Sequence, residues 1–221
     1  MERNVIILLR HGETNFASQG IIQGHSDDAI LTDTGIHQIE NASRMLASMK
    51  IDELYSSPLK RAVETTDIVR RCINITSDAV KYDNRLSEID FVGWTGMSKE
   101  DVLKNDSQRF GLWRTSPIEL EFDGYFPVKN LYSCIHMFCE PLLDPFSSRS
   151  TILISAHKGS ILSIIVTLLG LSSSEHNFLH IDHGSLTILR ESPRDDKQIC
   201  YEIIAANLKG SEIVLDSLAD V

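Results

Sequence analysis

The residues best suited to chemistry in this sequence stand where two apolar runs end. Arg10 and His11 follow the run Val5 to Leu9, and His157 follows the run Thr151 to Ser155 after a single alanine. Such runs predict buried strands, and the carboxyl ends of parallel strands form the edge where open α/β folds bind ligands. A cation and two imidazoles at one edge could hold an anion. Each histidine alone could equally be a surface residue in a strand-to-loop turn, so the prediction depends on their convergence.

A second arginine is expected near the same edge. The dipeptide Ser57-Pro58 is typical of a helix start, with the serine as N-cap and the proline in the first turn. Arg61 would then lie one turn inside that helix, close to the edge of the sheet. Gly12 would let the backbone turn sharply, so that the two side chains before it face one point. The alternative for Arg61 is a solvated basic face shared with Lys60, Arg70 and Arg71.

The hydrophobic pattern predicts the elements that position these residues. Short apolar runs predict strands, and apolar residues at three- and four-residue spacing predict helices. Strands are expected at 5–9, 51–56, 151–155, 185–190 and 199–205, and helices from 32, from 57, from 127 and over 160–169. Alternating strands and helices favour a parallel sheet. Two short helices at 98–104 and 107–113 would form an insertion over one end of the sheet, and the last dozen residues would form a weakly held tail.

Length and composition fit one α/β domain over residues 1–221, with a helical insertion at about 92–127. The chain has 221 residues, of which 42% are hydrophobic and 24% charged. Its net charge of −10 argues against nucleic acid as a partner but leaves an anionic small molecule open. No signal peptide is apparent and the apolar segment 161–171 is too short to cross a bilayer, so we expect a cytoplasmic protein without membrane contact. The four cysteines show no metal-site spacing.

The order and spacing of the motifs resemble those of the histidine phosphatase superfamily, the group that includes cofactor-dependent phosphoglycerate mutase. The resemblance covers roughly residues 4–190. It implies a three-layer α/β fold, with a mostly parallel mixed sheet flanked by helices. The matching stretches are Arg10-His11-Gly12-Glu13-Thr14, Gly20 with Gln23-Gly24, Leu31-Thr32 with Gly35, Ser56-Ser57-Pro58 with Arg61-Ala62 and Thr65-Thr66, Leu86-Ser87-Glu88-Ile89 with Gly93-Trp94 and Gly96, and His157-Lys158-Gly159.

The resemblance implies a role for each residue of the expected cluster. His11 would be the nucleophile that takes the phosphoryl group on a ring nitrogen and passes it to water. That nitrogen must be unprotonated, and neighbouring guanidinium groups favour this state by disfavouring the imidazolium. Arg10 and Arg61 would bind phosphate oxygens, often as bidentate pairs. His157 would donate a hydrogen bond to the transferring group.

Further residues would line the pocket. Glu88 would be the general acid that protonates the leaving alkoxide, because an ester oxygen is a poor leaving group without a proton. Gln23 and the backbone amide of Gly24 would lie along the substrate or the phosphate. Without the resemblance, Glu88 would more simply be a loop carboxylate that caps Trp94 or Ser98.

The sequence departs from the family pattern at several positions. Ala17 stands where family members usually carry an asparagine. Asn15 lies two positions before that place, and we expect it to bind phosphate. Lys158 replaces a small residue and adds a cation beside the pocket. Gly124-Tyr125-Phe126 replaces a polar helix cap. Glu13 is expected to be structural, because a carboxylate there would repel phosphate unless it turned toward a neighbouring donor.

The leading hypothesis is a phosphatase that needs no metal or cofactor and hydrolyses a small phosphorylated metabolite through a phosphohistidine. A homodimer is compatible with the sequence. One alternative is a mutase of the phosphoglycerate type, which would use basic residues in the insertion such as Lys104, Arg109 and Arg114. Another is a non-catalytic phosphate-binding member of the family, which would be expected to lack Arg10, His11, Arg61 or His157. A metal site is a further alternative at three histidines that we expect in a loop, namely His176, His180 and His183.

Overall fold

One six-stranded sheet organises the protein. The structure, a computed structural model, describes residues 4–144, 150–172, 179–192 and 199–210. Within them the strand order is β3-β2-β4-β1-β5-β6. The first four of these strands run parallel, whereas β5 is antiparallel to β1 and β6 to β5. The strands are β1 (Val5–Arg10), β2 (Glu53–Ser56), β3 (Val80–Tyr82), β4 (Thr151–Ala156), β5 (Leu186–Ser192) and β6 (Cys200–Leu208).

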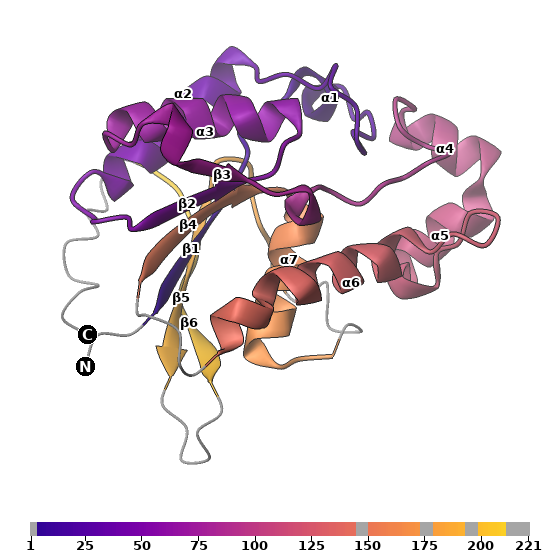
Figure 1. Ribbon diagram of the computed structural model, residues 1–221. Helices are drawn as coiled ribbons and strands as arrows, with labels where there is room; N and C mark the ends of the chain where they lie inside the picture. Colours follow the sequence, from indigo (N-terminus) through magenta and orange to yellow (C-terminus); the bar gives the residue numbers. More distant parts are fainter. Residues whose placement is uncertain (1–3, 145–149, 173–178, 193–198, 211–221) are drawn as a thin grey trace.

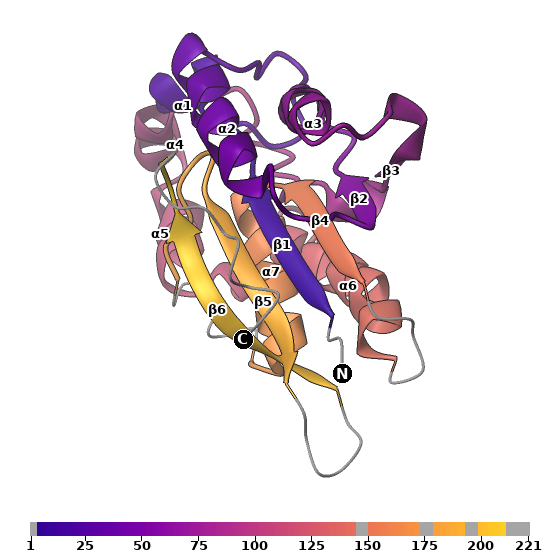
Figure 2. The same ribbon diagram turned by 90° about the vertical axis from the view of Figure 1, so that its left-hand side faces the viewer.

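Helices cover both faces of the sheet (Figures 1 and 2). Helices α2 (Asp33–Leu46) and α3 (Lys60–Cys72) lie on one face, and α6 (Pro127–Cys139) and α7 (Lys158–Leu169) lie on the other. The predicted three-layer α/β fold with a mostly parallel mixed sheet is therefore confirmed. Short elements connect these layers, namely α1 (Asn15–Ser18), η1 (Ser77–Ala79), η2 (Asn84–Leu86) and η4 (Glu140–Leu143).

Both faces of strand β1 are buried because helices cover the sheet on both sides. Ile6 and Leu8 belong to the core cluster that packs against α6 and α7. Ile7 and Leu9 belong to the cluster beneath α2 and α3. Side chains alternate between the two faces of a strand, so a strand covered on both faces reads as a continuous apolar run. This placement explains why the first apolar run of the sequence predicts its strand correctly.

The segment 92–127 forms a small helical unit beyond one end of the sheet (Figure 1). It contains α4 (Lys99–Asn105), α5 (Ser107–Thr115) and η3 (Pro117–Glu119), close to the two predicted short helices. Aromatic side chains hold it together around Trp94, whose ring contacts those of Phe91, Phe110, Trp113 and Phe122.

Several local predictions are wrong for identifiable reasons. Helix α3 begins at Lys60 rather than at Ser57, and its N-cap, Leu59, makes no side-chain cap bond. The hydroxyl of Ser57 is instead bound elsewhere, as described below. The short strand β3 was not predicted, since only Val80 of its residues is buried. The predicted C-terminal tail lies outside the described residues.

Candidate active site

Strand register brings His11 and His157 together. Arg10 is paired with Ala156 at the end of the parallel β1–β4 ladder, so the next residue of each strand is a histidine. The backbone N–H of His11 donates to the carbonyl of Ala156 at 3.0 Å, which continues the pairing beyond the ladder. The centroids of the two imidazole rings lie 5.1 Å apart. Both rings are buried. Their proximity confirms the prediction that the two histidines converge.

Arg61 reaches this pair from α3. Strand β2 ends beside β4, and the N–H of Ser57 donates to the carbonyl of Ser155 at 3.0 Å, so α3 starts at the same edge. Arg61 is 1% exposed. It donates to the carbonyl of Gly24 at 2.8 Å and to that of Ser26 at 3.3 Å. Arg61 is therefore a buried cation of the site and not part of a solvated face.

Arg10 is oriented by the loop before β5. It donates from Nη1 to the carbonyl of Ile181 at 2.6 Å and from Nη2 to the Nε2 atom of His183 at 2.7 Å. An arginine can only donate, so Nε2 of His183 accepts this bond and the imidazole is neutral. The Nε atoms of Arg10 and Arg61 are buried without a hydrogen-bond partner in the described part of the chain. These two N–H groups are available to an anion.

The tautomer of His11 follows from its backbone contact. Its Nδ1 atom lies 2.8 Å from the carbonyl oxygen of Gly12, and a carbonyl can only accept a hydrogen bond. Nδ1 therefore carries the ring proton, and Nε2 carries a lone pair in the neutral imidazole. Such a nitrogen can act as a nucleophile.

The surroundings keep the histidines neutral. Burial, followed by the charges of Arg61 and Arg10, lowers the pKa of His11 well below its usual value. Burial and the charge of Arg61 do the same to the pKa of His157. Burial lowers the pKa of each of the two arginines to about 10, so both stay cationic at neutral pH. Neither arginine forms an ion pair with a carboxylate in the described part of the chain, although Glu88 acts on both electrostatically. Two such cations next to unprotonated imidazoles are suited to bind an anion.

Glu88 lies at the N-terminus of α7. Its carboxylate accepts from the N–H of Gly159 at 3.1 Å and from the N–H of Ile89 at 2.9 Å. It caps neither Trp94 nor Ser98, because Trp94 donates to Asp106 and the hydroxyl of Ser98 to Asp101. A Cβ on Gly159 would lie 2.3 Å from Oε1 of Glu88. The glycine thus allows the carboxylate to sit directly on the helix.

Two residues of the site were missed by reasoning from the sequence. Ser57, expected to cap α3, lies with its hydroxyl 2.8 Å from Nε2 of His157. His183 lies against Arg10, and its ring centroid is 5.4 Å from that of His11. The spacing of His183 with His180 drew attention to metal binding instead. No cluster of potential metal ligands occurs among the residues that the structure describes.

The loop residues predicted to bind phosphate differ in their placement. The carbonyl of Gly24 holds Arg61, as stated above, which brings this glycine to the site. The side-chain oxygen of Gln23 accepts from the hydroxyl of Thr14 at 3.0 Å. Asn15 bonds only within its own loop, to the backbone of Phe16, Asp28 and Ile30, so the structure does not bring it to the histidines.

Glycine at position 12 is required by close packing. Its φ is not positive, so the left-handed conformation that favours glycine is not the reason for this residue. A Cβ on Gly12 would lie 2.5 Å from the carbonyl oxygen of Gly35, and one on Gly35 would lie 2.1 Å from that of Glu13. The loop that carries His11 therefore packs directly on the first turn of α2. Glu13 turns away from the site and accepts from the hydroxyl of Thr32 at 2.9 Å, in agreement with its expected structural role.

Comparison with known proteins decides the family. The model of the histidine phosphatase superfamily (branch 1) matches residues 6–200, which is most of the chain. The chain belongs to the histidine phosphatase superfamily. This confirms the resemblance found in the motifs.

Relatives of this superfamily member include named phosphatases. It is 29% identical over 191 residues to a probable 2-carboxy-D-arabinitol-1-phosphatase of Arabidopsis thaliana, across 86% of this chain and 39% of the plant protein. It is 28% identical over 189 residues to phosphoserine phosphatase 1 of Hydrogenobacter thermophilus, across 86% of this chain and 87% of that protein. The chain thus spans about two fifths of the length of two plant relatives.

The fold of this histidine phosphatase superfamily member is shared by solved structures. A mycobacterial glucosyl-3-phosphoglycerate phosphatase superposes with a TM-score of 0.76 at 21% identity, over 92% of this chain and 99% of that one. At this identity the similarity concerns the fold alone.

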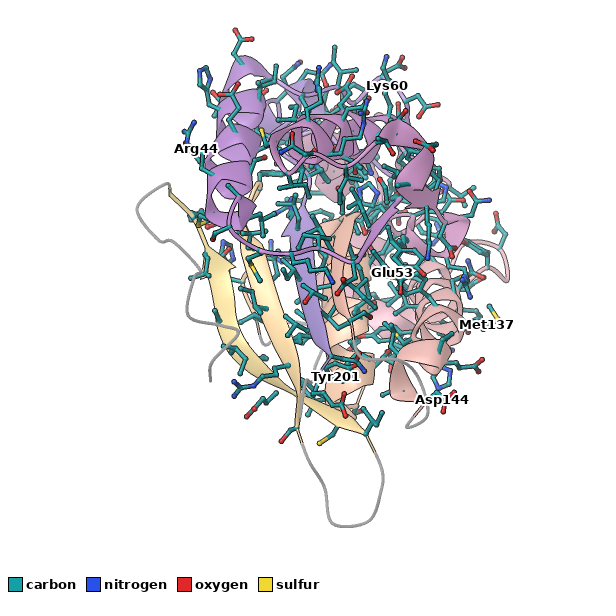
Figure 3. The ribbon with its side chains drawn as sticks, turned by 60° about the vertical axis from the view of Figure 1, so that its left-hand side comes forward. Arg44, Glu53, Lys60, Met137, Asp144 and Tyr201 are labelled. Atoms are coloured by element: carbon teal, nitrogen blue, oxygen red, sulfur yellow. The ribbon has the colours of Figure 1, made fainter. Side chains whose placement is uncertain are left out.

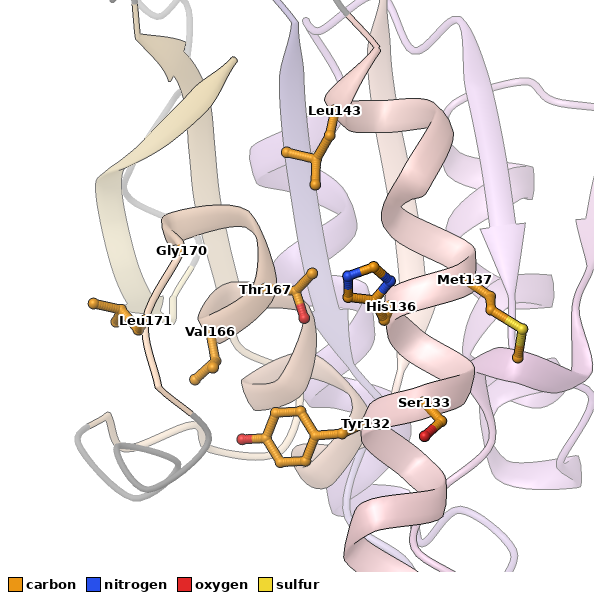
Figure 4. A pocket seen from close by; sticks show the side chains of 9 residues that line it. All are labelled: Tyr132, Ser133, His136, Met137, Leu143, Val166, Thr167, Gly170 and Leu171. Atoms are coloured by element: carbon orange, nitrogen blue, oxygen red, sulfur yellow. The ribbon is translucent and has the colours of Figure 1, made fainter. Parts of the chain in front are cut away.

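A separate hollow lies between α6 and α7 in this superfamily member (Figure 4), and neither His11 nor His157 lines it. Its lining includes Tyr132 and His136 on α6, and Thr167 and Gly170 at the C-terminal end of α7. Helix α7 has 12 residues, and at 1.5 Å per residue its two ends are about 18 Å apart. The catalytic candidates stand at its other end.

None of the described helices has the length and apolar character needed to span a membrane.

Proposed function

We propose that this protein is a phosphatase that hydrolyses a small phosphate monoester through a phosphohistidine on His11. The observation that carries the proposal is the unprotonated Nε2 of His11, buried beside the guanidinium groups of Arg10 and Arg61. The family and the relatives named as phosphatases support a phosphatase in general. A small phosphorylated metabolite is the proposed substrate.

In the first half of the reaction, Nε2 of His11 attacks the phosphorus and the ester P–O bond breaks. The leaving oxygen takes a proton from Glu88, which acts as the general acid. Arg10 and Arg61 bind the non-bridging oxygens, and His157 donates to the transferring group. Positioning and charge stabilisation supply most of the rate of such transfers.

In the second half, water attacks the phosphohistidine. Glu88, now a carboxylate, takes a proton from the water, the P–N bond breaks and inorganic phosphate leaves. His11 returns to its neutral form and Glu88 to its protonated form, so the cycle closes. We propose no metal for either half, because the two arginines and the neutral imidazoles already provide the positive charge and the donors that the dianion needs.

The mutase alternative would use basic residues of the segment 92–127. Arg109, one of its candidates, donates to the carbonyl of Glu121 at 2.9 Å and pairs with Asp106 at 3.5 Å. It also lies over the ring of Phe122. These contacts give Arg109 a role within its own segment, which favours hydrolysis over return of the phosphoryl group to a second acceptor.

The test is a panel of phosphate monoesters assayed with excess chelator. We expect the parent to hydrolyse at least one ester and His11→Ala to lose roughly 10³-fold or more of that activity. His37→Ala is the matched control, because His37 is an exposed histidine of α2. Hydrolysis that needs a metal, or that survives the loss of His11, would contradict the proposal.

Labelling with a radioactive substrate provides an independent test. We expect an acid-labile, base-stable phosphoryl group on the parent and none on His11→Ala. Passage of the label to water supports the phosphatase, whereas passage to an added hydroxy-acid acceptor would show a mutase.

A further inference from the structure

Lys158 is a cation beside the phosphate site that forms no ion pair with a described carboxylate. It is the first residue of α7, between His157 and Gly159, and it is half-buried. Among the described residues its ammonium forms no hydrogen bond or ion pair, although Arg10, Glu88 and Asp182 are near enough to act on it electrostatically. Burial and the charge of Arg10 lower the pKa of Lys158, which is the effect of a cation held among cations.

The two carboxylates near Lys158 are already engaged. Glu88 accepts the N–H groups of Gly159 and Ile89, as described above. Asp182 accepts from Nδ2 of Asn207 at 3.1 Å, from His180 at 2.7 Å and from the ammonium of Lys209. Neither carboxylate is bonded to Lys158, so its charge is available to a ligand.

When a phosphate ester is bound, its negative charges do not balance all the cationic side chains of the site. Arg10 and Arg61 together balance the two negative charges of a phosphate monoester dianion. In the proposed reaction Glu88 is protonated before transfer, and the imidazoles are neutral. Asp182 is balanced by Lys209. Lys99 also acts electrostatically on Lys158, but its side chain is exposed to solvent. Lys158 therefore remains as the half-buried cation beside the phosphate site that no bound phosphate oxygen or described carboxylate balances.

We propose that Lys158 binds a second anionic group of the substrate, a carboxylate attached close to the phosphate ester. One ammonium matches the single charge of a carboxylate, whereas a second phosphate dianion would leave a negative charge unbalanced. The inference rests on the proposed phosphate site and narrows its substrate class to carboxylated phosphate monoesters.

The test is a binding comparison that needs no turnover. Titration calorimetry on the His11→Ala protein measures the dissociation constants of 3-phosphoglycerate and of glycerol 3-phosphate. These two ligands share a three-carbon phosphate ester and differ in one end group, which is a carboxylate in the first and a hydroxymethyl in the second. The same measurements are made with Lys158→Met and Lys158→Arg added to His11→Ala.

We expect His11→Ala to bind 3-phosphoglycerate about tenfold tighter than glycerol 3-phosphate, as for one charge-assisted contact. Lys158→Met should abolish this preference and change the affinity for glycerol 3-phosphate by less than about twofold. Lys158→Arg, which keeps the charge, should retain most of it. Lys60→Met is the matched control, since Lys60 is exposed on the outer side of α3 (Figure 3).

Three outcomes would overturn the inference. The first is equal affinity of His11→Ala for the two ligands. The second is an equal loss of affinity for both ligands in Lys158→Met, which would mean that Lys158 binds the phosphoryl group. The third is that His11→Ala binds neither ligand. The proposed function fails separately, through a parent protein without His11-dependent hydrolysis. A binding preference that depends on Lys158 would survive that failure.

Discussion

The hydroxyl of Ser57 lies 2.8 Å from Nε2 of His157, although 100 residues separate the two in the chain. Both residues are fully buried. The same hydroxyl accepts from the N–H of Leu59 at 3.3 Å, so it is held from the side of α3 as well. Because a histidine ring has two orientations of similar shape, this bond determines which ring edge His157 presents to the site. Ser57 is thus a positioning residue for His157.

Removal of this hydroxyl should reduce turnover. We expect Ser57→Ala to lower kcat about tenfold with a smaller change in KM, because loss of a buried hydrogen-bond partner costs about 1–3 kcal/mol. Ser57→Thr keeps the hydroxyl and should recover most of the rate. Steady-state kinetics check both variants, with thermal unfolding to show that they fold. An unchanged kcat in Ser57→Ala would exclude the positioning role.

The role of Glu88 can be tested through the leaving group. Glu88→Gln keeps an oxygen to accept from Gly159 but removes the proton donor. We expect kcat for an alkyl phosphate to fall about 10²–10⁴-fold, as for loss of general acid catalysis. The rate on p-nitrophenyl phosphate, whose phenolate leaves without a proton, should fall less than about tenfold. Equal losses on the two esters would show that Glu88 is not the acid.

Two helical glycines provide a matched pair for the packing of the His11 loop. Gly35→Ala places a Cβ 2.1 Å from the carbonyl oxygen of Glu13, whereas a Cβ at Gly111 in α5 meets nothing within 4 Å. Alanine favours a helix by about 1 kcal/mol over glycine, so Gly111→Ala should stabilise the protein by about that amount. Gly35→Ala should lower the free energy of unfolding by about 1–3 kcal/mol and reduce kcat as His11 shifts.

Denaturant unfolding measures both free energies under one condition. A Gly35→Ala protein as stable as Gly111→Ala would mean that the loop can move away without cost. The proposed need for close packing at the nucleophile would then be wrong.

The pH dependence of stability should report His183. Burial and Arg10 lower its pKa to about 3, so the folded protein holds it neutral while the unfolded chain protonates it below about pH 6.5. The unfolded state then binds more protons, and stability falls as the pH drops from about 6 to 4. His183→Gln, which can still accept from Arg10, should reduce this slope by about 1.4 kcal/mol per pH unit.

Denaturant titrations at several pH values measure the two slopes. His11 and His157, whose pKa values are also lowered, contribute to the slope of stability against pH in both proteins. The contribution of His183 is therefore the difference between the two slopes. Identical slopes would show that His183 is protonated in the folded protein, which its bond with Arg10 does not allow.

His11, His157 and Arg61 could be predicted because each is tied to a local pattern, whereas Glu88 was predicted from the family resemblance alone. His11 and His157 directly follow apolar strands, and adjacent parallel strands bring their ends to one edge. Arg61 lies in the first turn of α3, a few residues after strand β2, so it reaches the same edge. These inferences need only the type of each element, which hydrophobic periodicity reveals.

The partners of these residues could not be predicted in the same way. Arg10 is bonded to the carbonyl of Ile181 and to His183, more than 170 residues away, in a loop without periodicity. Asn15 was predicted to bind phosphate because it lies two positions before the usual place of the family's asparagine, yet its side chain bonds its own loop. A polar side chain in a loop has several competing partners, and only the folded arrangement decides among them.

By itself, the sequence determined the sheet with its two covered faces, the strands that end in His11 and His157, and the family. Hydrophobic burial along each strand is a local property, so its pattern is legible in the chain. The tertiary structure alone decided which nitrogen of His11 is free, that Ser57 holds His157, and that Lys158 forms no ion pair with any carboxylate in the described residues. Those features depend on hydrogen bonds and charges between segments far apart in sequence, and a hydrogen bond forms only where both partners meet at about 3 Å.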